Sequence, residues 1–236
     1  MDTLEWLNLT RHGESTGNVA YHASHGRGAE ESGIAERDAD VPLSERGRGQ
    51  AAALGRRLAR LPEDERPTLV LASPYLRTRD TAVIALEQLP YRLEVHTDER
   101  LRDRDQGVLE GLTHVGVQRR FPEEWERKQR IGKFYYRPPG GESWTDLALR
   151  LRSLYRDVQA DAPGGRVLVV THDATVVVTR YLVERLTEHE ILEIEKTPVA
   201  NCSLSRWRQD GGRLRPVVYN DRDHLAGLGG LAEPGR

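Results

Sequence analysis

Short apolar runs along the chain predict strands, because each run is too brief for a helix and ends in polar or turn-forming residues. We expect these strands over residues 4–9, 68–72, 92–97 and 166–170. The run at 166–170 is apolar on successive residues, which is typical of a strand covered on both faces of a sheet. The run at 92–97 alternates instead, with Leu93 and Val95 on one side.

Apolar residues spaced three and four positions apart predict helices between these strands. Ser44 and Ser143 stand where N-caps are expected, and Asp146 completes the spacing of a capping box with Ser143. Pro62 ends the first of these helices, and Pro122 breaks a charged one. We expect the helices over residues 44–61, 77–89, 115–129, 143–158 and 174–186.

Strands that alternate with helices predict an α/β fold of three layers, with helices on both faces of a mostly parallel central sheet. Without repeats or an interdomain linker, residues 1–225 are expected to form one domain. Residues 202–207 and 213–218 predict a closing hairpin. The polar stretch 21–40 lacks sustained periodicity and is expected to be a loop insertion that covers the site. The glycine-rich stretch 226–236 is expected to be a flexible tail.

The composition limits which binding partners and which cellular compartment we expect. The 236 residues carry a formal net charge of −2 with both signs interspersed, which argues against a nucleic-acid-binding surface. The single cysteine, Cys202, excludes an intramolecular disulfide and argues against a thiolate zinc site. His22 and His25 have no third ligand in view, so no metal is expected. With no signal-like start and no window near the roughly 20 apolar residues of a membrane span, we expect a cytoplasmic protein without membrane contacts.

Candidate chemistry follows the predicted strands. Arg11 and His12 come directly after the first strand, Arg77 follows the second, and His172 follows the strand at 166–170. If these strands are parallel neighbours, their carboxyl ends meet and bring two arginines and two histidines around one crevice. Guanidinium groups match the oxygens of a phosphoryl group, so the pattern favours a phosphate ester as ligand. Gly13 is expected to let the backbone turn and approach the ligand closely.

Several motifs, in order over nearly the whole chain, resemble the histidine phosphatase superfamily, the phosphoglycerate mutase-like proteins. The first is Arg-His-Gly-Glu-Ser at residues 11–15 with Asn18 beyond it. The others are Pro-Leu-Ser-Glu-Arg-Gly at 42–47, Ser-Pro-Tyr-Leu-Arg-Thr-Arg-Asp-Thr-Ala at 73–82, Pro-Gly-Gly-Glu-Ser at 139–143, Val-Thr-His at 170–172 and Asn-Asp-Arg-Asp-His-Leu at 220–225.

The resemblance implies roles for these residues. His12 would attack phosphorus as a neutral nucleophile and become a phosphohistidine, and like charges on nearby arginines favour its neutral form. No cofactor or metal is implied. The phosphoryl oxygens would be held by Arg11, Arg77, His172 and Asn18, with Ser15 or the backbone beside it assisting.

The proton donor of the family is usually a glutamate, and the resemblance places Asp103 at its position. A carboxyl group there would protonate the leaving oxygen and then activate water. Aspartate is one methylene shorter, so Asp105 remains the alternative. Asp173 is a second departure, because many members carry glycine after the second histidine; we expect Asp173 to face outward or to cap the following helix.

These residues predict a metal-independent phosphomonoester hydrolase that acts on small phosphorylated metabolites through a phosphohistidine. A phosphoglycerate mutase-type transferase is one alternative, which Asp103 and Gln106 disfavour because they depart from the mutase pattern. An inactive module that binds a phosphate ligand is the other, and retention of the two arginines and two histidines argues against it. Specificity is expected to reside in residues 21–40 and 115–137. The sequence leaves the substrate and the oligomeric state open, a homodimer included.

Overall fold

The computed structural model describes residues 4–228, which build one mixed, mostly parallel sheet. Its strands are β1 (Trp6–Arg11), β2 (Leu69–Ala72), β3 (Val95–Thr97), β4 (Arg166–Thr171), β5 (Leu204–Asp210) and β6 (Arg213–Asp221). They lie in the order β3-β2-β4-β1-β5-β6. The first four in this order pair in parallel, and the hairpin β5–β6 adds two antiparallel strands at one edge. All four predicted strands and the hairpin are therefore confirmed.

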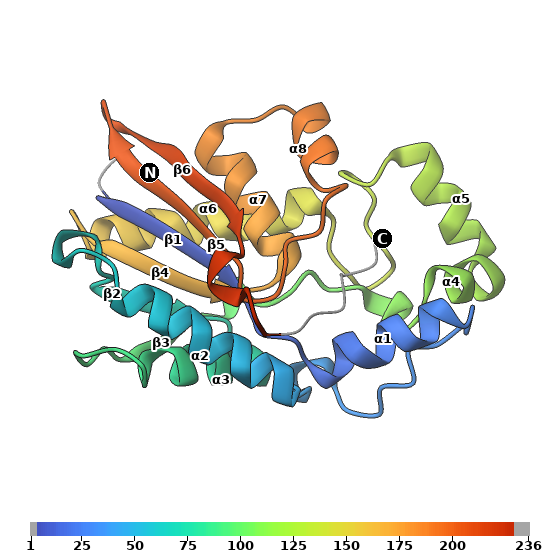
Figure 1. The fold of residues 1–236 in the computed structure, drawn as a ribbon. Coiled ribbons are helices and arrows are strands. Elements are labelled where there is room, and N and C mark those ends of the chain that lie inside the picture. Colours follow the sequence, from blue (N-terminus) through green and yellow to red (C-terminus); the bar gives the residue numbers. More distant parts are fainter. Residues whose placement is uncertain (1–3, 229–236) are drawn as a thin grey trace.

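Helices cover both faces of the sheet, which confirms the predicted three-layer fold. The helices are α1 (Thr16–Gly26), α2 (Glu45–Ala59), α3 (Leu76–Leu86), α4 (His114–Arg120), α5 (Pro122–Ile131), α6 (Trp144–Asp161), α7 (Asp173–Glu184) and α8 (Glu188–Ile194). In Figure 1, α2 and α3 lie on one face, and α6 and α7 lie on the other. Helices α1, α4 and α5 lie beyond the end of the sheet at which β1 leads into α1.

The central position of β4 explains why residues 167–170 are all apolar. Val167 and Val169 pack in the core on the side of α6 and α7. Leu168 and Val170 pack in a second core with residues of α2 and α3. All four side chains are fully buried, so the strand has no face left for polar residues.

The structure corrects the prediction of a continuous loop over residues 21–40. Helix α1 includes residues 21–26, and a 3₁₀ turn forms at Asp38–Asp40. The helix begins at Thr16, after the cap residue Ser15, and buries only Gly17 and Ser24. Small residues at the buried positions leave no apolar periodicity, and for that reason the pattern does not reveal the helix.

The ends of the other predicted helices lie close to the predicted positions. The break at Pro122 separates α4 from α5, and Ser143 caps α6 through the predicted box with Asp146. Helix α8 has no counterpart among the predicted elements. Most of the predicted tail, from residue 229 on, lies outside the described residues. None of the helices within residues 4–228 is long and apolar enough to cross a membrane.

Candidate active site

Three neighbouring strand ends bring the predicted site residues together. Strand β4 lies between β1 and β2, with Thr171 beside Arg11 and Val170 beside Ala72. The next residues on these strands are therefore His12, Ser73 and His172, at the same edge of the sheet. The rings of the two histidines lie edge to face with centroids 5.3 Å apart. The predicted convergence of these strand ends is confirmed.

His12 is held in one tautomer. Its Nδ1 lies 2.7 Å from the carbonyl oxygen of Gly13, and a carbonyl can only accept, so Nδ1 carries the proton. Nε2 is then left with a free lone pair. The side chain is almost fully buried. Burial, and after it the charge of Arg77, the coupling to the adjacent His172 and the charge of Arg11, hold the pKa of His12 well below its usual value. The ring is therefore neutral, as a nucleophile must be.

His172 takes the opposite tautomer. Its Nδ1 lies 3.4 Å from Nη2 of Arg77, and a guanidinium only donates, so this nitrogen accepts. Its Nε2 then carries the proton, which it donates to Oγ of Ser73 at 2.9 Å. Burial, followed by the charges of Arg77 and Arg11, lowers the pKa of His172 well below its usual value.

The glycine of the Arg-His-Gly motif serves backbone packing. A Cβ on Gly13 would lie 2.5 Å from the carbonyl oxygen of Gly47, and a Cβ on Gly47 would lie 2.0 Å from the carbonyl oxygen of Glu14. The two motifs at 11–15 and 42–47 thus require glycine where their backbones touch. Gly13 therefore lets its backbone approach the segment at 42–47 closely.

Both arginines of the site are anchored. Nη1 of Arg11 donates to the carbonyl oxygen of Val199 at 2.6 Å. Arg77 is only 3% exposed, and its guanidinium lies over the ring of Tyr75, 5.0 Å from the centroid. Fixed guanidinium groups can meet the charge of a phosphoryl group without reorganising.

Ser15 and Asn18 form the N-terminal cap of α1. Oγ of Ser15 accepts from the backbone N–H of Asn18, and Oδ1 of Asn18 accepts from that of Ser15, both at 3.1 Å. Asn201, a residue absent from the sequence prediction, donates to Oδ1 of Asn18 at 3.3 Å and to the carbonyl oxygen of His12 at 2.9 Å. The oxygen of Asn18 is thereby occupied, so its amide N–H groups are the part that a phosphoryl oxygen can use.

The two candidate acids lie in different places. Oδ2 of Asp103 is 3.7 Å from Nδ1 of His172 and 3.8 Å from Nη2 of Arg77. Asp105 is exposed and accepts instead from the backbone N–H of Gly107 at 2.7 Å. Asp103 alone of the two therefore has contacts with the histidines and arginines of the site.

Two carboxylates that the sequence prediction missed lie beside Asp103. Asp38 contacts Arg77. Burial raises the pKa of Asp38, Arg77 opposes that rise, and weaker repulsion from Asp103 and Asp105 adds to it. Glu110 is exposed to solvent on one side. Partial desolvation, and then the charges of Asp38, Asp103 and Asp105, raise the pKa of Glu110 to about 7. Asp173 lies in the first turn of α7 and is half-buried. The cap position belongs to His172, so of the two alternatives for Asp173 the capping role is wrong.

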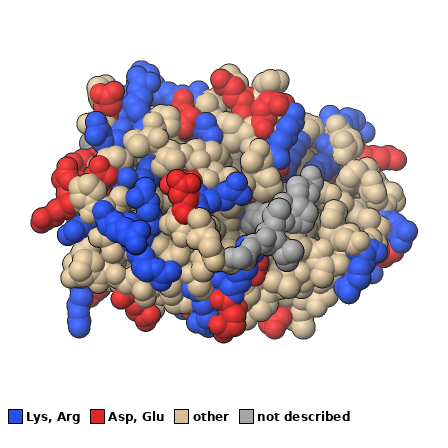
Figure 2. Space-filling model, viewed as in Figure 1, with Lys and Arg blue, Asp and Glu red and all other residues tan. Residues whose placement is uncertain are grey.

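The histidines of α1 stand among aromatic rings. His25 stacks on Tyr21, with centroids 6.0 Å apart, and lies edge to face with His114 at 5.9 Å. Within residues 4–228, the structure holds no group of three or more His, Cys, Asp or Glu side chains placed to bind a metal ion. Acidic and basic side chains are interspersed on the face shown in Figure 2.

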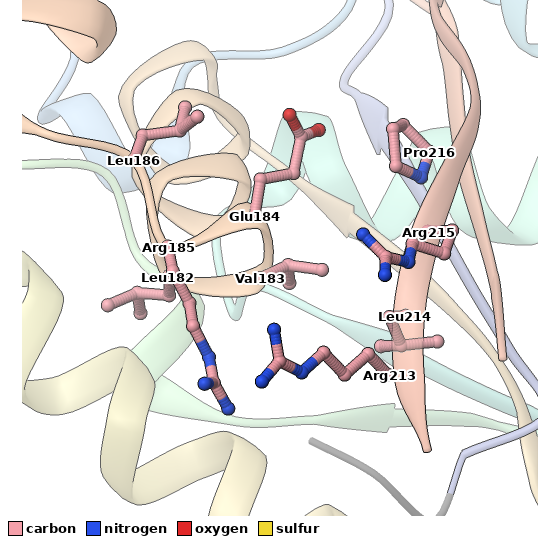
Figure 3. A pocket seen from close by; sticks show the side chains of 9 residues that line it. All are labelled: Leu182, Val183, Glu184, Arg185, Leu186, Arg213, Leu214, Arg215 and Pro216. Atoms are coloured by element: carbon pink, nitrogen blue, oxygen red, sulfur yellow. The ribbon is translucent and has the colours of Figure 1, made fainter. Parts of the chain in front are cut away.

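A hollow of about 360 Å³ lies at the other end of the sheet. It is lined by the C-terminal end of α7 and the start of β6, and Figure 3 shows the side chains of Arg185, Arg213 and Arg215 around it. In the register of the sheet, Arg215 of β6 lies opposite Arg208 of β5, and Arg208 lies opposite Trp6 at the start of β1. His12 follows the end of that strand, so the hollow is separate from the site of the two histidines.

The chain belongs to the histidine phosphatase superfamily, branch 1, whose family model matches residues 7–222. The phosphoglycerate mutase-like resemblance drawn from the motifs is thus confirmed, and the matched range includes every candidate residue described above.

Relatives of the chain include phosphatases and mutases. A metal-independent phosphoserine phosphatase of Arabidopsis thaliana is 31% identical over 223 residues, which are 94% of this chain and 84% of that protein. The 2,3-bisphosphoglycerate-dependent phosphoglycerate mutase 2 of Gloeobacter violaceus is 32% identical over 166 residues, 69% of this chain and 72% of that one. The solved structure of a mycobacterial glucosyl-3-phosphoglycerate phosphatase matches with a TM-score of 0.71 and 26% identity, covering 92% of this chain and 99% of its own. Family membership therefore leaves both reactions open.

Two buried neutral histidines make stability depend on pH. In the folded state the pKa of His12 and of His172 is well below 6.5, whereas the unfolded chain protonates them near pH 6.5. Below that pH the unfolded state binds more protons than the folded state. Each histidine should therefore lower the free energy of unfolding by about 1 kcal/mol for every unit by which the pH falls further. Glu110, with its raised pKa, acts in the opposite direction between about pH 4.5 and 7.

The histidine contribution can be isolated by urea unfolding of the wild type and His172→Asn between pH 7.5 and 5.5. The wild type should lose more stability on acidification than the variant, by about 1 kcal/mol per pH unit. His96 is exposed, so His96→Asn should retain the slope of the wild type. Equal slopes for wild type and His172→Asn would contradict a buried, neutral His172.

Proposed function

We propose that the protein is a metal-independent phosphomonoester hydrolase that works through a phosphohistidine at His12. The observation that carries the proposal is the bond from Nδ1 of His12 to the carbonyl oxygen of Gly13, which leaves the lone pair on Nε2. A neutral, oriented imidazole beside two fixed guanidinium groups has what nucleophilic attack on a phosphate ester requires.

The first step forms the phosphohistidine. Nε2 of His12 attacks phosphorus, the bond from phosphorus to the leaving oxygen breaks, and the proton of the Asp103 carboxyl passes to that oxygen. Arg11 and Arg77 hold the phosphoryl oxygens, with the amide of Asn18 and the cap at Ser15 completing the donor set. His172, whose Nε2 proton goes to Ser73, accepts from Arg77 through Nδ1 and so orients that guanidinium. Fixed donors of this kind stabilise the charge that spreads over these oxygens in the transition state.

The second step hydrolyses the intermediate. The Asp103 carboxylate takes a proton from water, and the water oxygen attacks phosphorus as the bond to Nε2 breaks. Orthophosphate leaves, and His12 and the protonated Asp103 are regenerated for the next turnover. One carboxyl group can therefore serve first as general acid and then as general base.

The exposure of Asp103 favours hydrolysis over a mutase reaction. Its side chain is 35% exposed, so solvent water reaches the group that would activate it. A mutase must instead keep water from its phosphohistidine until the second hydroxyl arrives. The phosphoserine phosphatase similar over 94% of the chain supports the same choice.

The test is phosphate release from p-nitrophenyl phosphate, phosphoglycerates and sugar phosphates, with and without a chelator. We expect orthophosphate from at least one ester at a rate that the chelator leaves unchanged. Interconversion of phosphoglycerates without phosphate release would establish the mutase instead. Loss of activity with the chelator would overturn metal independence.

A further inference from the structure

The segment between α1 and α2 places a carboxylate on the arginine assigned to the phosphoryl group. Asp38 lies in the 3₁₀ turn Asp38–Asp40. Its Oδ1 is 3.0 Å and its carbonyl oxygen 2.5 Å from Nη1 of Arg77, and its Oδ2 is 3.2 Å from Nη2. This two-pronged contact is the geometry in which a guanidinium binds an oxyanion.

The contact changes the charge that a substrate meets. Arg77 is buried, and Asp38 neutralises it from one side, while Nη2 also reaches His172 at 3.4 Å and Asp103 at 3.8 Å. The two histidines are neutral, and Arg11 and Arg77 are the cations whose charges act on both of them. A phosphoryl group therefore shares Arg77 with the Asp38 carboxylate.

The position of Asp38 relative to Asp103 indicates which part of the substrate it faces. In the proposed reaction Asp103 protonates the leaving oxygen, so the alcohol portion of the ester lies on the Asp103 side. Asp38 and Asp103 both approach the Nη2 end of Arg77, and Asp38 interacts electrostatically with Asp103 and Asp105. The alcohol thus enters a region where Asp38 adds negative charge close to the reaction.

We infer that Asp38 is a specificity-determining residue, an inference that rests on the proposed function. Its carboxylate on Arg77 disfavours phosphomonoesters whose alcohol carries a carboxylate, and it favours esters whose alcohol carries an ammonium group or only hydroxyls. Like charges a few ångströms apart in a partly buried site alter selectivity by a factor of ten or more.

The experiment measures kcat/KM for three small esters: O-phosphoethanolamine, glycerol 1-phosphate and 3-phosphoglycerate. Where an ester is not turned over, its inhibition constant against p-nitrophenyl phosphate replaces kcat/KM. Asp38→Asn should raise the preference for 3-phosphoglycerate over O-phosphoethanolamine about tenfold. Asp38→Ser should shift the preference in the same direction, which guards against a misfolded first variant.

Asp40 provides the matched control, because it lies in the same turn, is exposed and pairs with Arg37 at 2.9 Å. Asp40→Asn should leave the preference within about twofold of the wild type. An unchanged preference in both Asp38 variants would overturn the inference. If hydrolysis of p-nitrophenyl phosphate still depends on His12 in that case, the proposed function survives. A wild type that hydrolyses no phosphomonoester overturns both.

Discussion

Replacement of His12 by alanine should abolish turnover, lowering kcat by about 10⁴-fold or more. The variant keeps Arg11, Arg77 and Asp103, so it can still bind the ester, but it has no nitrogen to accept the phosphoryl group. The nearby His172 donates its Nε2 proton to Ser73 and accepts from Arg77 through Nδ1, so it does not offer a lone pair in place of His12. The measurement is orthophosphate release at saturating substrate.

His96→Ala is the control for this experiment, since His96 is an exposed histidine on the edge strand β3. It should keep the activity of the wild type, and circular dichroism should show that both variants fold. Retention of most of the activity by His12→Ala would show that the phosphoryl group never resides on this residue.

Asp103→Asn should lower kcat by about 10²- to 10⁴-fold while KM changes little. Asparagine preserves the size of the side chain but can neither donate the proton to the leaving oxygen nor accept one from water. The loss should be smaller for p-nitrophenyl phosphate, whose leaving group needs less help from an acid. Steady-state kinetics with this ester and with an alkyl phosphate give the comparison.

Asp105→Asn is the matched variant, because Asp105 lies two residues away and bonds to the backbone of Gly107. It should leave kcat within a few-fold of the wild type. If instead Asp105→Asn shows the large loss and Asp103→Asn is active, the proton donor has been assigned to the wrong carboxyl group.

The sequence predicts the fold and the centre of the site because both depend on local, strongly patterned segments. The buried strand at 166–170 is apolar on each residue after Arg166, and the parallel arrangement then brings His12 and His172 to one edge. Arg77 follows in the same way from the turn after β2. These side chains lie one to five residues beyond their strands, so the sheet alone determines their neighbourhood.

The surrounding residues could not be predicted because no periodic pattern positions them. Asp38 reaches Arg77 from an aperiodic segment, across 39 positions of the sequence. Asn201 reaches the backbone of His12 across 189 positions and lies in a turn before β5. Glu110 acquires its raised pKa from partial desolvation and from the charges of carboxylates that only the folded chain brings near it. Helix α1 escaped prediction because its buried positions are a glycine and a serine.

The most direct test of the account is to trap the covalent intermediate. The wild type is mixed with a rapidly hydrolysed ester, quenched in base during turnover, digested and examined by mass spectrometry. We predict one phosphoryl group, on His12 and on no other residue, and its absence from His12→Ala. Steady hydrolysis with an unmodified His12, or with the phosphoryl group on another side chain, would contradict the phosphohistidine mechanism.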